Sequence, residues 1–204
     1  MTKFKMCGIM SVSDADVLND IKPDYVGFVF AHKSKRFVDE KTAQTLRDSL
    51  DDSIKTVGVF VNENPENIAY LCKKNIIDII QLHGDEDDKY IKLLRNKTDR
   101  QIIKAFSIES INDIVAAQNS TADYVLLDSG KGGTGKVFDW NLVSEIDREY
   151  FLAGGLDADN VSEAILKLHP FAVDVSSGIE INGIKDENKM RRFACAVKGE
   201  NYDK

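Results

Sequence analysis

Asp128 lies where an apolar run meets a glycine-rich loop. Residues 124–127 are Tyr-Val-Leu-Leu, and the loop that follows contains Gly130, Gly132, Gly133 and Gly135. In parallel α/β proteins, catalytic groups lie at the carboxyl ends of buried strands, and glycines let the backbone come close to a ligand. We therefore predict that Asp128 takes part in catalysis and that Gly133 binds substrate.

Two nucleotide-binding motifs can be fitted to this loop. Residues 130–136 have the spacing of a Walker A loop, but Val137 stands where Ser or Thr should hold magnesium. The glycines also fit G-x-G-x-x-G, yet that fingerprint normally follows the first strand, and here the next strand ends in glycines rather than an acid. A plain connection without a ligand is the third alternative. Four glycines in six residues carry an entropic cost that a plain connection does not require, so a ligand-binding loop is favoured.

The elements that must position this loop recur along the chain. Short runs that are apolar on both faces indicate buried parallel strands, at residues 4–7, 25–30, 56–61, 77–82, 101–106, 124–127, 150–153 and 171–175. Amphipathic stretches between them predict helices that start after Ser13, Asp39, Asn64, Asp85, Asp139, Asp157 and Asp186, with a further helix over 107–118.

Eight strand-helix units in strict alternation predict a closed (β/α)8 barrel, because open doubly wound sheets usually have five or six strands. With 204 residues the barrel must be of minimal size. No linker or composition break divides the sequence, so we expect one catalytic domain over residues 1–204.

Composition limits the class of protein. Hydrophobic residues make up 43% and charged residues 30%, and the net charge of −7 argues against nucleic-acid or anionic-membrane partners. No apolar run approaches the roughly 20 residues of a membrane helix. Three separated cysteines suit a reducing cytoplasm. No cluster has metal-ligand spacing, so we expect a cytoplasmic protein with no metal and no cofactor.

The ends of the last two predicted strands have the features of a phosphate site. Gly154 and Gly155 precede a predicted helix start, and Ser177 and Gly178 follow the last strand. Barrels commonly bind phosphate with the loops after strands 7 and 8, where backbone amides attract anions without a lysine. The alternative is that these residues are only turn and helix punctuation. We predict that all four bind a phosphorylated substrate.

Cys7 follows the first strand and therefore lies on the same rim as Asp128. A thiol and a carboxyl group on either side of a small molecule provide a base and an acid for proton transfer. Taken alone, Cys7 could be a small buried apolar residue and Asp128 a helix cap or a partner of a loop lysine. Their shared rim favours catalytic roles for both.

Taken together, the strand ends resemble those of phosphoribosylanthranilate isomerases of the tryptophan pathway. The resemblance covers essentially the whole chain and rests on eight segments in order: FKMCGI from Phe4, DYVGFVF from Asp24, the turn at 34–36, VGVFVN from Val57, QLHGDE from Gln81, LLDSGKGGTGKVFDW from Leu126, LAGGLDADNV from Leu152, and DVSSGIE with GIKD from Asp174 and Gly183. It implies an Amadori rearrangement of N-(5-phosphoribosyl)anthranilate.

The resemblance also implies roles for single residues. The family's general acid corresponds to Asp128, its general base to Cys7 and its carboxylate-binding arginine to Arg36, although Lys35 stands where the family often has proline. Gln81 and His83 lie on the rim, and we predict that they contact substrate. The alternatives for His83 are that it holds the Cys7 side or that it is a surface histidine at a strand end. With reference pKa values, few molecules would hold a protonated Asp128 and a Cys7 thiolate together near pH 7, so we predict that burial raises the pKa of Asp128, nearby cations lower that of Cys7, or both.

Three rival functions remain. A sugar-phosphate epimerase or an indole-glycerol-phosphate synthase would share the phosphate site, but neither is expected to combine Cys7 with Asp128. A barrel that only binds a phosphorylated metabolite would not need either group. The sequence does not distinguish a monomer from a homodimer.

Overall fold

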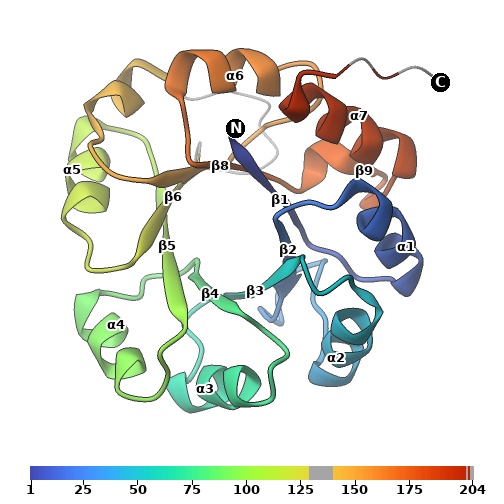
Figure 1. Cartoon of the computed structure of the whole chain (residues 1–204). Helices are drawn as coiled ribbons and strands as arrows, with labels where there is room; N and C mark the ends of the chain where they lie inside the picture. Colours follow the sequence, from blue (N-terminus) through green and yellow to red (C-terminus); the bar gives the residue numbers. More distant parts are fainter. Residues whose placement is uncertain (129–139, 201, 203–204) are drawn as a thin grey trace.

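The computed structural model describes residues 1–128, 140–200 and 202, and their strands form a ring surrounded by helices (Figure 1). The barrel strands are β1 (Lys3–Cys7), β2 (Tyr25–Val29), β3 (Lys55–Phe60), β4 (Ile79–Leu82), β5 (Gln101–Ser107), β6 (Tyr124–Asp128), β7 (Tyr150–Leu152) and β8 (Ala172–Val175). The α-helices are α1 (Val12–Ile21), α2 (Glu40–Ser49), α3 (Pro65–Lys73), α4 (Asp88–Arg95), α5 (Ile111–Asn119), α6 (Val161–Leu168) and α7 (Glu187–Lys198).

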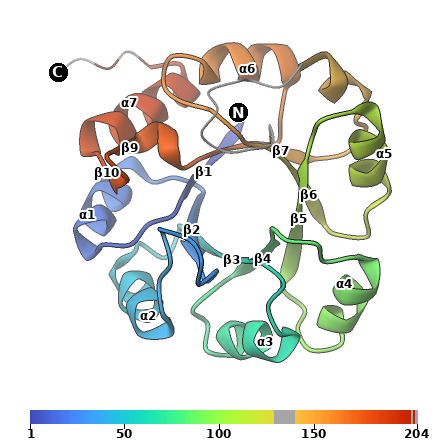
Figure 2. The ribbon, with the colours of Figure 1, turned by 180° about the vertical axis from the view of Figure 1, so that it is seen from behind.

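The strands close into a parallel barrel in the order β1 to β8, with β8 pairing back to β1. The view from behind shows the same ring with the helices outside it (Figure 2). The predicted (β/α)8 barrel is therefore confirmed. The register aligns Lys5 of β1 with Asp174 of β8, and Cys7 with Gly27 of β2. Because side chains alternate along a strand, Lys5 and Cys7 share one face.

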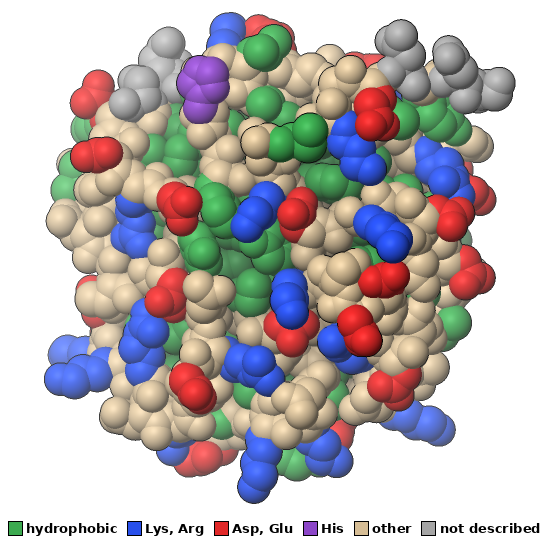
Figure 3. All heavy atoms as spheres, viewed as in Figure 1, with side chains coloured by type: hydrophobic (Ala, Val, Ile, Leu, Met, Phe, Trp, Pro, Cys, Tyr) green, Lys and Arg blue, Asp and Glu red, His purple; other side chains and the backbone are tan. Residues whose placement is uncertain are grey.

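Two layers of apolar side chains hold the barrel together. The larger cluster fills the space between strands and helices, and a smaller cluster fills the interior with Val57, Ile103 and Leu126 among its members. At the amino ends of the strands, Tyr25, Tyr124, Phe151 and Phe171 stack or meet edge to edge. The Lys3 ammonium lies 4.5 Å from the Phe171 ring centroid, and these groups form an aromatic floor. In the axial view of Figure 3, apolar side chains fill the centre of the ring, with charged ones around them.

Side-chain caps set where the helices begin. Asp39, Asn64 and Asp186 are the N-caps of α2, α3 and α7, as predicted. Three predicted starts were wrong by a few residues. Ser11 caps α1 in place of Ser13, Asp87 caps α4 in place of Asp85, and Asn160 precedes α6 in place of Asp157. Asp157 instead accepts hydrogen bonds from the amides of Asp159 and Asn160, which form the turn before the helix.

Two other segments differ from the prediction. The helix expected over 107–118 begins only at Ile111, because Ser107 still belongs to β5. Between β6 and β7 the chain forms a 3-10 helix, η1 (Trp140–Glu145), rather than an α-helix, and the predicted cap Asp139 lies outside the described residues. After β8, a short 3-10 helix η2 (Ser177–Ile179) leads into a hairpin of β9 (Glu180–Ile181) and β10 (Ile184–Lys185). No helix in the described part of the chain has the length and apolar character needed to cross a membrane.

Candidate active site

Cys7 is the last residue of β1 and points into the barrel interior. Its side chain is buried and packs with Val29 and Val59. A Cβ at Gly27 would lie 2.6 Å from Cys7 Sγ and 3.1 Å from Lys5 Nζ, so only glycine at this position of β2 leaves room for both groups. The thiol and the ammonium group therefore lie side by side in the interior.

The charge environment of Cys7 differs from the prediction. Burial raises the pKa of the thiol, and Lys5 and Lys185 oppose this without reversing it. The predicted net lowering by cations is therefore wrong for the protein without substrate. Cations do lie near the thiol, as predicted, but burial raises its pKa by more than they lower it, because a buried thiolate loses its water.

Asp128, at the end of β6, faces Gln81 and His83 of the β4 end. Gln81 Nε2 and His83 Nδ1 are 2.9 Å apart, and His83 Nε2 lies 3.5 Å from Asp128 Oδ2. Among the described residues, Asp128 Oδ1 is buried without a hydrogen-bond partner. His83 and Asp128 also line a pocket of about 620 Å³ between the ends of β4, β5 and β6. The three groups form a connected row that ends at a carboxyl oxygen open to a further partner.

Asp174 of β8 connects the two sides of the interior. It accepts a hydrogen bond from Lys5 Nζ at 3.0 Å, and burial raises its pKa while Lys5 opposes that effect. The strands β6, β7, β8 and β1 follow one another in the barrel, so Asp174 lies on the short way from Asp128 to Cys7. The structure thus places both predicted catalytic residues in one interior, at the carboxyl ends of their strands.

Arg36 lies in the loop after β2 and is held by Glu180. Its Nε and Nη2 donate to the two carboxylate oxygens at 2.6 and 2.7 Å, while Lys185 Nζ donates to the same carboxylate at 2.7 Å. The Arg36 side chain also covers Gly8, where a Cβ would come within 2.4 Å of Arg36 Cδ. The Arg36 side chain is still 31% exposed, so part of it can reach a ligand.

The loop at Arg36 closes without a proline. Amides of Ser34 and Phe37 donate to the carbonyls of Ala31 and Ser34, and the Arg36 amide donates to Ser34 Oγ. Lys35 is exposed in this turn. These local hydrogen bonds therefore stabilise the turn, although Lys35 stands where a proline would favour it.

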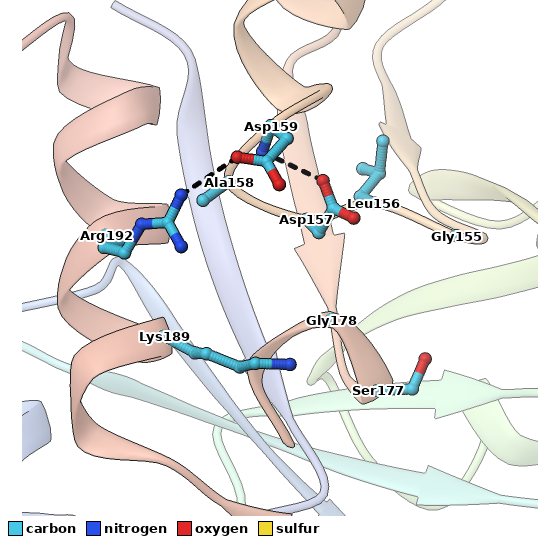
Figure 4. A pocket seen from close by; sticks show the side chains of 9 residues that line it. All are labelled: Gly155, Leu156, Asp157, Ala158, Asp159, Ser177, Gly178, Lys189 and Arg192. Atoms are coloured by element: carbon cyan, nitrogen blue, oxygen red, sulfur yellow. Dashed lines mark hydrogen bonds and ion pairs between the residues drawn. The ribbon is translucent and has the colours of Figure 1, made fainter. Parts of the chain in front are cut away.

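The structure brings together the ends of β7 and β8. Gly155, Ser177 and Gly178 line a pocket of about 300 Å³, together with Lys189 and Arg192 of α7 (Figure 4). Gly178 touches the preceding loop so closely that a Cβ would lie 2.0 Å from the Leu156 carbonyl oxygen. Gly154 and Gly155 have φ values of 88° and 67°, the left-handed region that favours glycine. Gly133 lies outside the described residues.

The sequence analysis assigned no role to four charged residues that support the site. Lys5, Asp174, Glu180 and Lys185 are all buried. A signal was present for the first two, since each is a charged residue inside a short apolar strand, where an unpaired charge is costly. Only the register of β1 and β8 shows that they are partners.

A closed barrel of eight parallel strands, with ionisable groups gathered at the strand carboxyl ends, defines a (β/α)8-barrel enzyme. The family model for N-(5'phosphoribosyl)anthranilate isomerase matches residues 4–196. The chain belongs to this family, and the resemblance predicted from the sequence is confirmed.

Known phosphoribosylanthranilate isomerases are similar to this chain over nearly its whole length. N-(5'-phosphoribosyl)anthranilate isomerase of Endomicrobium trichonymphae is 45% identical over 194 residues, which cover 93% of this chain and 95% of the relative. The crystal structure of the Thermotoga maritima phosphoribosyl anthranilate isomerase is 37% identical in sequence, with a TM-score of 0.89. The match covers 98% of this chain and 100% of that chain. The Thermotoga maritima enzyme is dimeric. A phosphoribosyl anthranilate isomerase in complex with reduced 1-(o-carboxyphenylamino)-1-deoxyribulose 5-phosphate is 35% identical, covers 98% and 100% and has a TM-score of 0.86.

Proposed function

We propose that the protein is the phosphoribosylanthranilate isomerase of tryptophan biosynthesis. It converts N-(5-phosphoribosyl)anthranilate into 1-(2-carboxyphenylamino)-1-deoxyribulose 5-phosphate by an intramolecular Amadori rearrangement. Family membership over residues 4–196 supports this function, as does the product-like ligand bound by a solved relative. The observation that carries the mechanism is the placement of Cys7 and Asp128 in one barrel interior, with Asp174 between their strands.

Asp128 is the general acid in this proposal. It protonates the ring oxygen of the phosphoribosyl group, the C1′–O bond breaks, and the amine nitrogen supplies the electrons that form the iminium ion. The buried Asp128 Oδ1 has no hydrogen-bond partner among the described residues, which leaves it available to the substrate. His83, 3.5 Å from Oδ2, orients the carboxyl group.

Cys7 is the general base. Its thiolate removes the proton from C2′ of the iminium ion, and the electrons of the C–H bond form the enolamine, which tautomerises to the ketone product. The raised pKa of the thiol makes the thiolate scarce at neutral pH but strongly basic when it forms. Because the reaction also needs a protonated acid, kcat/KM reports both groups together and not the thiol alone.

The remaining predicted residues bind the two ends of the substrate. Arg36 meets the anthranilate carboxylate with the part of its side chain that stays exposed, since its Nε and Nη2 are held by Glu180. Gly154, Gly155, Ser177 and Gly178 hold the phosphate through backbone amides and a hydroxyl group, with Gly133 contributing from the loop after β6. Lys189 and Arg192 line the same pocket, as do Asp157 and Asp159, and Arg192 is paired with Asp159.

The wider context is also part of the proposal. The chain acts as one catalytic domain in the cytoplasm, without metal or cofactor, and with no nucleic-acid or membrane partner. It is a monomer or a homodimer, and the dimeric Thermotoga maritima relative favours the second. A barrel that only binds the metabolite is the rival, and it would tolerate loss of Cys7 without loss of function.

The decisive experiment is a turnover assay with chemically generated phosphoribosylanthranilate, following the loss of anthranilate-type fluorescence. We expect turnover by the wild type, and a decrease in kcat of roughly 10²- to 10⁴-fold in Asp128→Asn and in Cys7→Ser. Cys195→Ser, a half-buried cysteine of α7, is the matched control and should remain active. Unchanged turnover in both site variants would refute the proposed mechanism. Absence of turnover by the wild type would refute the proposed function.

A further inference from the structure

Lys5 is a lysine with no exposed surface, buried in the middle of β1. The proposed reaction gives it no role, and burying an ammonium group is costly unless a partner compensates it. Asp174 supplies that partner, with 3.0 Å between Lys5 Nζ and Asp174 Oδ1. The two residues are also direct partners in the register of β1 and β8.

The same ammonium group borders the Cys7 thiol. Lys5 and Cys7 are two residues apart on one strand and so project from the same face. The space left by the missing side chain of Gly27 lies within 2.6 Å of Cys7 Sγ and 3.1 Å of Lys5 Nζ, which brings both atoms to one point in the interior. A pair of opposite charges that served only stability would not need to lie against the thiol.

We propose that Lys5 is a positioning residue that stabilises the thiolate form of Cys7, and that Asp174 holds Lys5 in place. This inference rests on the proposed function, in which Cys7 is the base. Lys5 transfers no proton in this role. The thiolate removes the C2′ proton of the substrate and becomes a thiol, while the ammonium keeps its charge throughout.

The protonation of Lys5 agrees with this role. Burial alone would lower its pKa, but the charges of Asp174 and Cys7 outweigh that effect and raise it, so the ammonium stays charged over the working pH range. Other charged groups near Cys7 are Asp174 of β8, Lys185 of β10 and Arg36 after β2, while β2 itself contributes the uncharged Gly27. Of these, Lys5 exerts the largest lowering effect on the thiol and Asp174 an opposing one.

This arrangement predicts that changing Lys5 and changing Asp174 shift the titration of Cys7 in opposite directions. Removing the cation in Lys5→Met should move the titration of Cys7 to higher pH by about one unit or more, a tenfold decrease in the thiolate fraction at a given pH below the transition. Removing the anion in Asp174→Asn should move the titration to lower pH. Two changes that merely loosened the barrel would not displace the thiol titration in opposite directions.

The titration can be followed without turnover. The ultraviolet absorbance of the thiolate is recorded against pH for each variant, and the curve of the same variant carrying Cys7→Ser is subtracted. Lys104→Met is the matched control, because Lys104 is also a buried barrel lysine paired with a carboxylate, Glu86, but does not act on Cys7. We expect the order Lys5→Met, wild type, Asp174→Asn from high to low titration pH, with Lys104→Met at the wild-type value.

A second comparison tests the proposal even if Lys5→Met alone folds poorly. Adding Lys5→Met to Asp174→Asn removes both charges together, and the double variant should titrate at higher pH than Asp174→Asn alone. Coincident curves in that comparison, or a Lys5→Met titration that does not move upward, would overturn the inference. Full activity of Cys7→Ser would instead refute the base assigned in the proposed function, and the titration order would then still report on Lys5 separately.

Discussion

Gln81 and His83 of the β4 end are joined by a 2.9 Å contact between the Gln81 amide nitrogen and His83 Nδ1. In this orientation of the Gln81 amide its NH2 group donates to His83 Nδ1, and His83 Nε2 faces Asp128. His83 Nε2 lies 3.5 Å from Asp128 Oδ2, so the imidazole faces the carboxyl group that we propose as the acid. His83 is therefore placed to orient the Asp128 carboxyl group.

We predict that His83→Asn lowers kcat more than it changes KM. The decrease should be roughly tenfold, the effect of about 1.4 kcal/mol lost from the transition state. His169→Asn is the control, because His169 ends α6 with φ of 46°, a conformation that asparagine tolerates. Steady-state kinetics of both variants test this. Equal kinetics for His83→Asn and the wild type would show that Asp128 does not depend on His83.

Arg36→Lys should raise KM by roughly 10- to 100-fold with a smaller effect on kcat. Lysine cannot make the two parallel hydrogen bonds that Arg36 makes to Glu180, and it presents a point charge to the substrate carboxylate. Arg100→Lys is the control, because Arg100 contacts Asn75 outside the site. If Arg36→Lys leaves KM unchanged, the guanidinium of Arg36 does not bind the anthranilate carboxylate.

Glu180 should make the stability of the protein sensitive to acid. Burial would raise its pKa, but hydrogen bonds from Arg36 and Lys185 outweigh burial and lower it below the ordinary value of 4.5. A lowered pKa stabilises the fold fully above about pH 4.5, and this contribution is lost as the pH falls through the folded-state pKa. Urea unfolding between about pH 3 and 6 should show a smaller pH dependence in Glu180→Gln. Parallel curves for the two proteins would contradict this.

Gly178→Ala tests the contact between the two loops that we propose bind phosphate. The new Cβ would lie 2.0 Å from the Leu156 carbonyl oxygen, so one loop must move. We expect a loss of about 1–3 kcal/mol in the free energy of unfolding and a higher KM. In the control Gly183→Ala, φ of 81° is strained but no atom lies within 4 Å of the new Cβ, so stability should fall while KM stays the same. Equal KM changes in both variants would argue against a phosphate site at Gly178.

Several parts of the fold followed from local sequence patterns. Each barrel strand was predicted within two residues of its observed bounds, because a buried parallel strand is apolar on both faces. The helix starts were less certain, since several polar residues compete as caps. Ser11 and Ser13 illustrate this, because their hydroxyl groups hydrogen-bond to each other and only Ser11 caps α1.

The site was predictable only in part. Cys7 and Asp128 are recognisable because each ends a strand, and strand ends meet at one rim. The partner of Lys5 was not recognisable, since Asp174 is 169 residues away and the pairing depends on how the barrel closes. The pKa of Cys7 was misjudged for the same reason, because the depth of burial is a property of the closed barrel and not of the strand.

The aromatic floor has a consequence for how ligands are exchanged. In the described part of the chain, the rings of Tyr25, Tyr124, Phe151 and Phe171 pack against one another at the amino ends of the strands. Substrate and product must therefore enter and leave by the same opening, and the barrel holds one or the other at a time. The product of this enzyme should act as a simple competitor of its own substrate.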